Sequence, residues 1–251
     1  QFKPHSPGNQ RPDHRRSQAP AQRPGGRGEL KADRMNLVYR ISWLLFRLVF
    51  ATYFRWRVYH PEHVPLTGPV ILASNHASFL DPPLVGSPLR RMVNYLARDT
   101  LFGLPVIGTL LRAWQVVPVD REGGGAAGLR AILDRLLGDG AILLFPEGTR
   151  TTDGQLQKAR SGVGLVVIKS QAPVVPVRVF GTFEAMRRHQ LVPWPRRVAI
   201  TYGQPLDFSA LRAEARTCPK PRLKEIYQQV ADEIMAAIAN LEPHTDKTEF
   251  P

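Results

Sequence analysis

The chain has very little cysteine and lacks several common catalytic patterns. Cys218 is the single cysteine in 251 residues, which excludes an internal disulfide framework, and no group of cysteines and histidines has the spacing of a zinc site. The zinc-protease pattern H-E-x-x-H and the G-x-S-x-G pattern of α/β-hydrolases are both absent. These absences argue against a metalloprotease and a serine hydrolase.

Acidic residues are also few, and this leaves a strong positive charge. The chain has 34 Lys and Arg against 21 Asp and Glu, a formal net charge of +13. Residues 1–34, with eight basic and three acidic residues, account for +5, so +8 remains on the body of the chain. Such a body predicts an anionic partner: nucleic acid, anionic lipid, a phosphorylated substrate or an acidic protein.

Large apolar residues are nearly missing from residues 1–33, which are rich in Pro, Arg, Gln and Gly. Such a segment cannot bury enough surface to offset the entropy of ordering, so we predict a disordered basic tail. Residues 34–60 are instead strongly apolar and aromatic, with arginines set among them. An arginine near mid-bilayer costs roughly 3 kcal/mol, so we predict a helical segment that lies in the membrane interface. Packing of this helix on the protein's own core is the alternative.

Apolar strands and amphipathic helices alternate over residues 61–245. This alternation predicts an α/β fold with a mostly parallel or mixed central sheet covered by helices. The predicted strands are 69–73, 115–119, 141–145, 173–180 and 196–203, and the predicted helices are 129–137, 161–170 and 222–241.

A histidine and an aspartate follow the first predicted strand, in the stretch SNHASFLDPP, residues 74–83. Residues five apart do not meet on a straight helix, so His76 and Asp81 can pair only across a turn. Asp81 before Pro82 suits an N-cap, which leaves His76 in the preceding loop within reach of the carboxylate. The carboxylate could then fix the imidazole tautomer and leave its other nitrogen to act as a base. In the alternative interpretation, Asp81 is a cap alone and His76 only packs.

The stretch FPEGTR, residues 145–150, follows another predicted strand. Its proline and glycine favour a tight turn whose backbone N–H groups, together with Arg150, could hold a phosphate. Glu147 would repel a phosphate, so we expect it to position Arg150 or another cation, or to accept a hydrogen bond from a substrate hydroxyl. Arg121, in VPVDRE, also lies just past a strand, where ligands of α/β sheets gather. An ordinary loop with a surface ion pair is the alternative.

Two further patterns have weaker support. The stretch GGGAAG, residues 123–128, matches the dinucleotide fingerprint G-x-G-x-x-G. Three charged residues separate it from the preceding strand, however, and the two carboxylates among them would disfavour a pyrophosphate. Ser74 and Ser78 flank His76, but neither lies in a nucleophile elbow.

Taken together, these stretches resemble the 1-acylglycerol-3-phosphate acyltransferases, the lysophosphatidate acyltransferases of glycerolipid synthesis. NHASFLD resembles the first block of that family, VPVDR the second, FPEGTR the third and VVPV, around Pro176, the fourth, and the blocks occur in the family's order. KARSGVG resembles the stretch between the third and fourth blocks, with Lys158 and Gly162 at the matching positions. The tail lies outside the resemblance.

The resemblance implies transfer of a fatty acyl group from an acyl thioester to the free hydroxyl of 1-acylglycerol 3-phosphate, which yields phosphatidic acid. It implies His76 as the general base, Asp81 as the acid that orients it, and no acyl-enzyme, cofactor or metal. The residues expected to bind substrate are Arg121, Glu147, Gly148, Thr149, Arg150 and Lys158.

The resemblance also implies the partners. The donor is acyl-CoA or acyl carrier protein, the acceptor is a lysophospholipid, and the expected location is the cytoplasmic face of the cell membrane, against an anionic membrane surface. Nucleic acid is not expected, because the body contains no known nucleic-acid-binding module. The alternatives are the same chemistry on another lysophospholipid or on glycerol 3-phosphate, and a non-catalytic basic module at a membrane surface.

Overall fold

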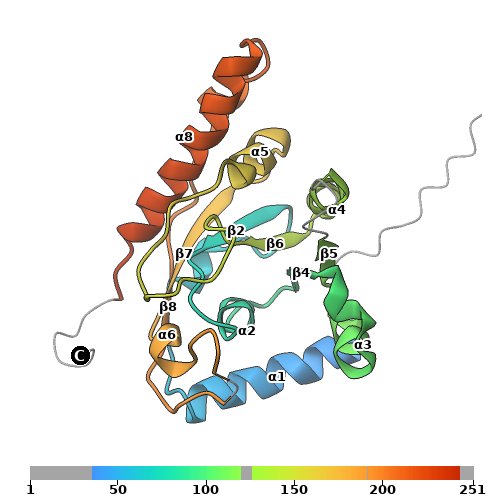
Figure 1. Cartoon of the computed structure of the whole chain (residues 1–251), viewed down its shortest axis with the longest axis vertical. Coiled ribbons are helices and arrows are strands. Elements are labelled where there is room, and N and C mark those ends of the chain that lie inside the picture. The colour runs from blue at the N-terminus through green and yellow to red at the C-terminus, as the bar shows by residue number, and fades with distance from the viewer. Residues whose placement is uncertain (1–35, 120–125, 191, 244–251) are drawn as a thin grey trace, which may run out of the picture. The chain divides into compact units, whose positions relative to one another are not determined.

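The computed structural model describes residues 36–119, 126–190 and 192–243 (Figure 1). Its helices and strands alternate along most of this length, as the sequence predicted. In chain order the elements are α1 (Leu37–Thr52), β1 (Arg57–Tyr59), η1 (Pro61–His63), β2 (Val70–Ser74), α2 (Asp81–Gly86), β3 (Val93–Asn94), β4 (Leu96–Arg98), η2 (Asp99–Gly103), α3 (Pro105–Ala113), β5 (Val117–Val119), α4 (Ala126–Leu137), β6 (Ala141–Leu144), α5 (Ser161–Lys169), β7 (Val174–Phe180), α6 (Thr182–Ala185), β8 (Ala199–Tyr202), α7 (Ser209–Glu214) and α8 (Lys220–Ala239).

The central sheet has six strands in the order β1-β8-β7-β2-β6-β3. Strands β7, β2, β6 and β3 run parallel to one another, β8 runs antiparallel to β7, and β1 runs parallel to β8. Strands β4 and β5 pair in a separate two-stranded parallel sheet, so the predicted strand at 115–119 lies outside the central sheet. The prediction of a mostly parallel or mixed sheet covered by helices is confirmed.

Both faces of the central strands are buried, which explains their unbroken apolar sequences. Along β2, Ile71 and Ala73 pack into a core with residues of α4, α5 and α8, whereas Val70 and Leu72 pack on the opposite side with residues of α1 and α2. Figure 1 shows α5 and α8 on one side of the sheet and α1 and α2 on the other. The sheet therefore holds the ends of β2 and β6 between two helical layers.

Helix α1 is shorter than the predicted helical segment 34–60. Its first turn is capped by Asn36, whose side chain accepts a hydrogen bond from the backbone N–H of Tyr39 at 2.8 Å. The helix ends at Thr52, and a left-handed residue, Arg55 (φ 45°), precedes the edge strand β1. The apolar pattern of this segment continues into β1, so composition alone could not show where the helix ends.

Helix α1 also has two different apolar faces. Phe50 is buried in the protein's own core, whereas Leu44, Leu45 and Leu48 are 64%, 56% and 60% exposed. In the ranges that the structure covers, every helix is too short or too polar to cross a bilayer. Core packing, the alternative considered for this segment, therefore does occur, and an apolar face remains exposed beside it.

Candidate active site

His76 and Asp81 meet at the carboxyl end of β2. The Nδ1 atom of His76 lies 2.8 Å from Oδ2 of Asp81. The Asp81 side chain is fully buried, whereas that of His76 is 17% exposed and lines a cavity. A carboxylate can only accept in this pair, so the imidazole carries its proton on Nδ1 and keeps the lone pair on Nε2. The predicted pairing across a turn is therefore present.

The expectation that Asp81 caps the following helix is wrong by one residue. Helix α2 begins at Asp81 itself, and the next two positions, Pro82 and Pro83, have no N–H groups to offer a capping side chain. Oδ2 of Asp81 turns back instead and accepts hydrogen bonds from the N–H groups of Ala77 at 2.6 Å and Ser78 at 2.7 Å. One carboxylate oxygen thus shapes the loop and orients the imidazole.

The serines beside His76 have hydrogen-bond partners in the backbone. The hydroxyl of Ser78 donates to the carbonyl of Met186 at 2.8 Å, and that of Ser74 donates to the carbonyl of Asn75 at 3.1 Å. Neither hydroxyl is directed at the imidazole, so the arrangement does not support a serine nucleophile.

The loop after β6 encloses the His76 loop. The Phe145 ring stacks on the imidazole of His76, with centroids 3.7 Å apart and planes 11° apart. The N–H of Thr151 donates to the carbonyl of His76 at 2.9 Å. On the other side, the Asn75 side chain exchanges two hydrogen bonds with the backbone of Val179 in β7. The position of the imidazole is thus fixed from two neighbouring strands.

Glu147 lies in the same loop and is 3% exposed. Burial raises the pKa of its carboxyl to about 7, a shift opposed by hydrogen bonds from the backbone N–H groups of Gln157 and His76. Its Oε2 atom has no hydrogen-bond partner in the part of the chain that the structure describes. Among the described residues, no ion pair joins this carboxyl to Arg150, one of the partners that the sequence suggested.

A cavity of about 1410 Å³ opens beside His76. Most of its wall is apolar and comes from segments far apart in the sequence. These wall residues include Tyr39, Trp43, Phe46, Leu96, Leu101, Leu111, Trp114, Val116, Val119, Leu129, Ile132, Leu144, Val163, Leu165 and Val166. The space is of the size and character of a site for a large apolar ligand.

Four arginines also line this cavity: Arg98, Arg150, Arg160 and Arg188. The guanidinium of Arg150 stacks on the exposed ring of Phe79, 3.5 Å from its centroid. Burial lowers the pKa of Arg150, and the positive charges of Arg188 and Arg98 lower it further. Clustered guanidinium groups that repel one another form a binding site for an anion such as a phosphate.

The candidate residues from the sequence fall into three groups. His76, Gly148, Thr149 and Arg150 line the cavity, and Asp81 lies behind His76. Lys158 is exposed and is not among the lining residues. Arg121 lies outside the described residues, as do the first three glycines of GGGAAG.

Sequence reasoning missed three of the four arginines. Arg160 is two residues beyond Lys158 in the same basic stretch, and it lines the cavity, whereas Lys158 does not. Gly148, with φ of 69°, leaves room for Arg160, because an added Cβ would lie 2.9 Å from its Cδ. Arg98 and Arg188 belong to no pattern that a single sequence shows.

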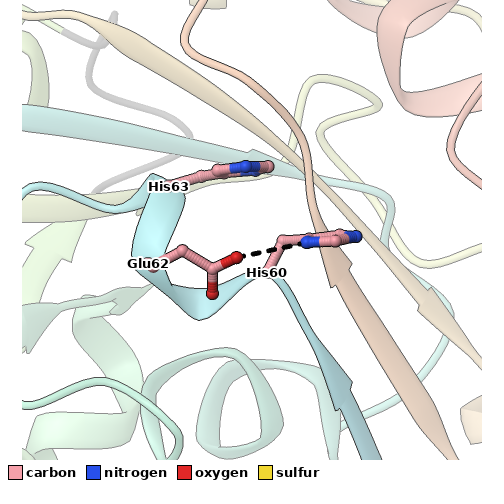
Figure 2. Close-up of side chains that lie close together, drawn as sticks. All are labelled: His60, Glu62 and His63. Atoms are coloured by element: carbon pink, nitrogen blue, oxygen red, sulfur yellow. Dashed lines mark hydrogen bonds and ion pairs between the residues drawn. The ribbon is translucent and has the colours of Figure 1, made fainter.

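A second cluster of ionisable side chains lies at η1, with β8 and β7 between it and β2. Here Nδ1 of His60 lies 3.2 Å from Oε1 of Glu62, and His63 contacts the carbonyl of Tyr202 and the side chain of Gln204. Figure 2 shows the two imidazole rings one above the other, with centroids 5.0 Å and planes 12° apart. A metal ion lies in the plane of each imidazole that binds it, so two stacked rings cannot both bind one ion as they lie.

Comparison with known proteins agrees with this arrangement. The model of the acyltransferase family matches residues 55–180, half of the chain. The 1-acyl-sn-glycerol-3-phosphate acyltransferase BAT2 of Brassica napus is 31% identical over 128 residues, which are 50% of this chain and 37% of that protein. The Bacillus subtilis protein called 1-acyl-sn-glycerol-3-phosphate acyltransferase is 28% identical over 165 residues, 64% of this chain and 79% of its own length. This chain thus spans little more than a third of the Brassica relative.

A solved structure shares the fold. The 1-acyl-sn-glycerophosphate (LPA) acyltransferase PlsC of Thermotoga maritima superposes with a TM-score of 0.62 over 81% of both chains, at 21% sequence identity. The match of the family model over half of the chain shows the family itself. As the resemblance to 1-acylglycerol-3-phosphate acyltransferases predicted, this chain belongs to the acyltransferase family.

Proposed function

We propose that the chain is a 1-acylglycerol-3-phosphate O-acyltransferase, which acylates the free hydroxyl of 1-acylglycerol 3-phosphate and forms phosphatidic acid. The observation that carries the proposal is the His76–Asp81 pair, 2.8 Å apart, beside a largely apolar cavity that four arginines also line. A lysophosphatidate has a hydroxyl, a phosphate and an acyl chain, and each has a matching group there. The names of the Brassica and Bacillus relatives support the same acceptor.

His76 acts as the general base in this proposal. Nε2 takes the proton from the acceptor hydroxyl while its oxygen attacks the thioester carbonyl, and Asp81 holds the opposite nitrogen. The tetrahedral intermediate then expels the thiolate, which takes the proton from His76 and leaves as the free thiol. Base catalysis of this kind contributes about 10² to 10⁴-fold, and no acyl-enzyme or cofactor takes part. The donor, acyl-CoA or acyl carrier protein, is a substrate.

The arginines hold the phosphate of the acceptor. Arg150 is the central one, because Phe79 fixes the plane of its guanidinium at the cavity. Arg98, Arg160 and Arg188 line the same cavity, and Gly148 and Thr149 form part of its wall between Arg150 and Glu147. Arg121 is proposed to join this group, on the strength of its block in the sequence. The apolar wall takes an acyl chain.

An anionic membrane surface is the proposed partner of α1, at the cytoplasmic face of the cell membrane. Leu44 and Leu48 on α1 and Val106 on α3 are 64%, 60% and 73% exposed, and exposed Arg40 lies on α1 beside them. The two helices adjoin, because the indole N–H of Trp114, just after α3, donates to Ser42 of α1 at 3.0 Å. Exposed leucines next to arginine suit the boundary between headgroups and acyl chains.

The test is an acyl-transfer assay with labelled lysophosphatidate and either acyl-CoA or acyl carrier protein, with His76→Ala as the blank. We expect thiol release that depends on lysophosphatidate, and a loss of at least about 10²-fold in the variant. Glycerol 3-phosphate and phosphate-free lysolipids serve as competing acceptors, and faster turnover of one of these would replace the proposed acceptor. Salt-sensitive binding of nucleic acid without thiol release would contradict an enzyme altogether.

A further inference from the structure

We infer that the segment between α6 and β8 forms a second membrane-binding surface, which binds anionic phospholipid headgroups. It consists of Arg187, Val192, Trp194 and Arg196, and these four residues are called the headgroup surface below. It lies far along the chain from α1, the helix already proposed to meet the bilayer. Lipid binding by this surface depends on the fold alone, whereas its expected effect on acyl transfer rests on the proposed function.

The segment is basic and aromatic. Residues 186–197 read MRRHQLVPWPRR, with four arginines and no aspartate or glutamate. Arg187 and Arg196 are exposed, and Trp194 and Val192 are 65% and 72% exposed. Exposed tryptophan beside arginine is typical of protein surfaces that lie at the boundary between headgroups and acyl chains.

The charged and apolar groups of the headgroup surface lie close together. Arg187, Trp194 and Arg196 line one hollow of about 330 Å³, together with Glu184 and Gln190. One carboxylate against two guanidinium groups leaves the hollow positive, so it favours a phosphate. A hollow that two arginines and an indole share suits a molecule that is anionic at one end and apolar at the other.

Hydrogen bonds hold the backbone of this surface in shape. The N–H of Trp194 donates to the carbonyl of Ala185 in α6 at 2.7 Å, and the N–H of Arg196 donates to the carbonyl of Trp194 at 2.8 Å. The side chain of Gln190 donates to the carbonyl of Val192 at 2.8 Å. A surface that is already ordered loses little entropy when it binds a ligand.

The headgroup surface adjoins α1. The hydroxyl of Tyr53, the residue directly after α1, donates to the carbonyl of Pro193 at 2.9 Å. Figure 1 shows the segment after α6 beside the carboxyl end of α1. Tyr53 is itself 44% exposed, so apolar surface continues from α1 to Val192 and Trp194.

The same segment also reaches the cavity beside His76. Met186 and Arg188, the two neighbours of Arg187 in sequence, line this cavity. The hydroxyl of Ser78 donates to the carbonyl of Met186 at 2.8 Å. Headgroups bound at Arg187 therefore bring the bilayer to the wall of the cavity that a lipid acceptor has to enter.

An acidic protein such as acyl carrier protein is the other partner that these arginines could attract. The exposed apolar groups favour lipid instead. A bilayer offers acyl chains next to anionic headgroups along the whole line from the leucines of α1 to Trp194, and so matches both kinds of side chain.

Sedimentation of the full chain with vesicles of mixed neutral and anionic phospholipid tests the arginines. We expect Arg187→Gln/Arg196→Gln to bind these vesicles roughly 10-fold more weakly at low salt, because two charges near the surface are lost. Arg130→Gln/Arg216→Gln, at two arginines that are exposed elsewhere, is the matched control and should stay within about 2-fold of wild type. An equal loss in the two double variants would overturn the proposal.

Fluorescence tests the indole. Trp194→Phe keeps an aromatic ring at an exposed site, so the emission of wild type less that of this variant reports on Trp194 alone. After vesicles are added, we expect this emission to be quenched by phospholipid with brominated acyl chains and shielded from iodide in the water. An indole that iodide still reaches, and that brominated lipid does not quench, would contradict lipid contact.

Turnover separates the headgroup surface from the proposed function. Arg187→Gln/Arg196→Gln should lower kcat/KM about 10-fold for lysophosphatidate in mixed vesicles, and less than about 2-fold for a short-chain, monomeric lysophosphatidate, because neither residue lines the cavity beside His76. If wild type acylates no acceptor but the difference in vesicle binding is present, the proposed function fails and the headgroup surface stands. If the double variant binds vesicles like wild type and raises only the KM for acyl carrier protein, lipid is the wrong partner.

Discussion

Arg91 and Arg150 lie at opposite ends of the central sheet, and their guanidinium groups have different surroundings. At the amino ends of β2 and β6, Arg91 is 6% exposed and donates hydrogen bonds of 2.7–2.9 Å to the carbonyls of Pro65, Gly68 and Asp139. At the carboxyl ends, Arg150 packs on Phe79 and makes one long contact, 3.5 Å, with the carbonyl of Arg188.

The difference shows that arginine stabilises the fold at the amino ends of the strands and is available to bind a ligand at their carboxyl ends. Three backbone carbonyls accept hydrogen bonds from Nη1 and Nη2 of Arg91, so this guanidinium connects three loops within the protein. Around Arg150 the positive charges of Arg188 and Arg98 outnumber the single negative charge of Asp81, and the cavity lies beside them, an arrangement that favours an added anion. We therefore expect changes at the carboxyl end to reduce activity and changes at the amino end to reduce stability.

The largest effect is expected from Asp81→Asn. Asparagine keeps the shape of the side chain, and its amide oxygen can accept the three hydrogen bonds that Oδ2 accepts, but it lacks the negative charge that stabilises the imidazolium, so kcat for acyl transfer should fall at least about 10²-fold. Turnover with lysophosphatidate, measured beside circular dichroism, checks this. Activity close to wild type would contradict the role of His76 as the general base.

Arg91→Ala should lower the stability of the fold and leave kcat nearly unchanged. The loss of three charge-assisted hydrogen bonds should lower the free energy of unfolding by about 3 kcal/mol, with kcat of the folded protein within about 2-fold of wild type. Urea unfolding measures this, and exposed Arg90→Ala, the adjacent residue, is the control, expected within about 0.5 kcal/mol. A selective loss of turnover would contradict the division between the two ends.

Glu147 should make stability depend on pH. Its folded pKa of about 7 exceeds the ordinary value of 4.5, so the folded state binds the proton more tightly. The resulting stabilisation is present below pH 4.5 and is lost as the pH rises through 7, by up to about 3 kcal/mol. The free energy of unfolding should therefore fall between pH 5 and 8 in wild type and less in Glu147→Gln. Equal slopes would show that this carboxyl is not buried as described.

Arg150→Ala should weaken acceptor binding with little loss of stability. We expect the KM for lysophosphatidate to rise about 10-fold, and the KM for a phosphate-free lysolipid to change much less, because the lost contact is to phosphate. Exposed Arg216→Ala, at a residue that does not line the cavity, is the matched control and should be near wild type. An equal rise for both acceptors would argue against the phosphate site.

The smallest effect is expected on the exposed face of α1. Leu44→Ser should weaken binding to vesicles of mixed neutral and anionic phospholipid by less than about 10-fold, since one apolar side chain contributes about 1 kcal/mol. Leu137→Ser changes an 83% exposed leucine on α4 and is the control. Sedimentation with vesicles measures both, and an equal effect of the two would mean that α1 does not face the bilayer.

Much of the fold could be predicted because the central strands are continuous apolar runs of ordinary length. Predicted boundaries of β2, β6, β7, α5 and α8 lie within two residues of those observed. The two- and three-residue strands β1, β3 and β4 were missed, since segments this short have no measurable period. Tertiary pairing with β8 and β6 decides that these residues are strands at all.

The candidate site likewise has one part that the sequence predicts and one part that it does not. His76 and Asp81 are close in sequence, so local patterns suffice to pair them. Arg98 and Arg188 come from β4 and from the segment after α6, and they reach the cavity only through the folding of the whole domain. A single sequence does not show which distant residues come together in the folded domain, whereas it does show a short motif.

The ring stack between Phe145 and His76 has an electronic consequence. The face of a phenyl ring carries partial negative charge and attracts a cation that lies over it. An imidazolium formed at position 76 would hold its charge against this π face, 3.7 Å away between centroids. The attraction, on the order of 1 kcal/mol, grows as the proton arrives and fades as it departs, so the ring that follows β6 stabilises the transient charge of the catalytic step.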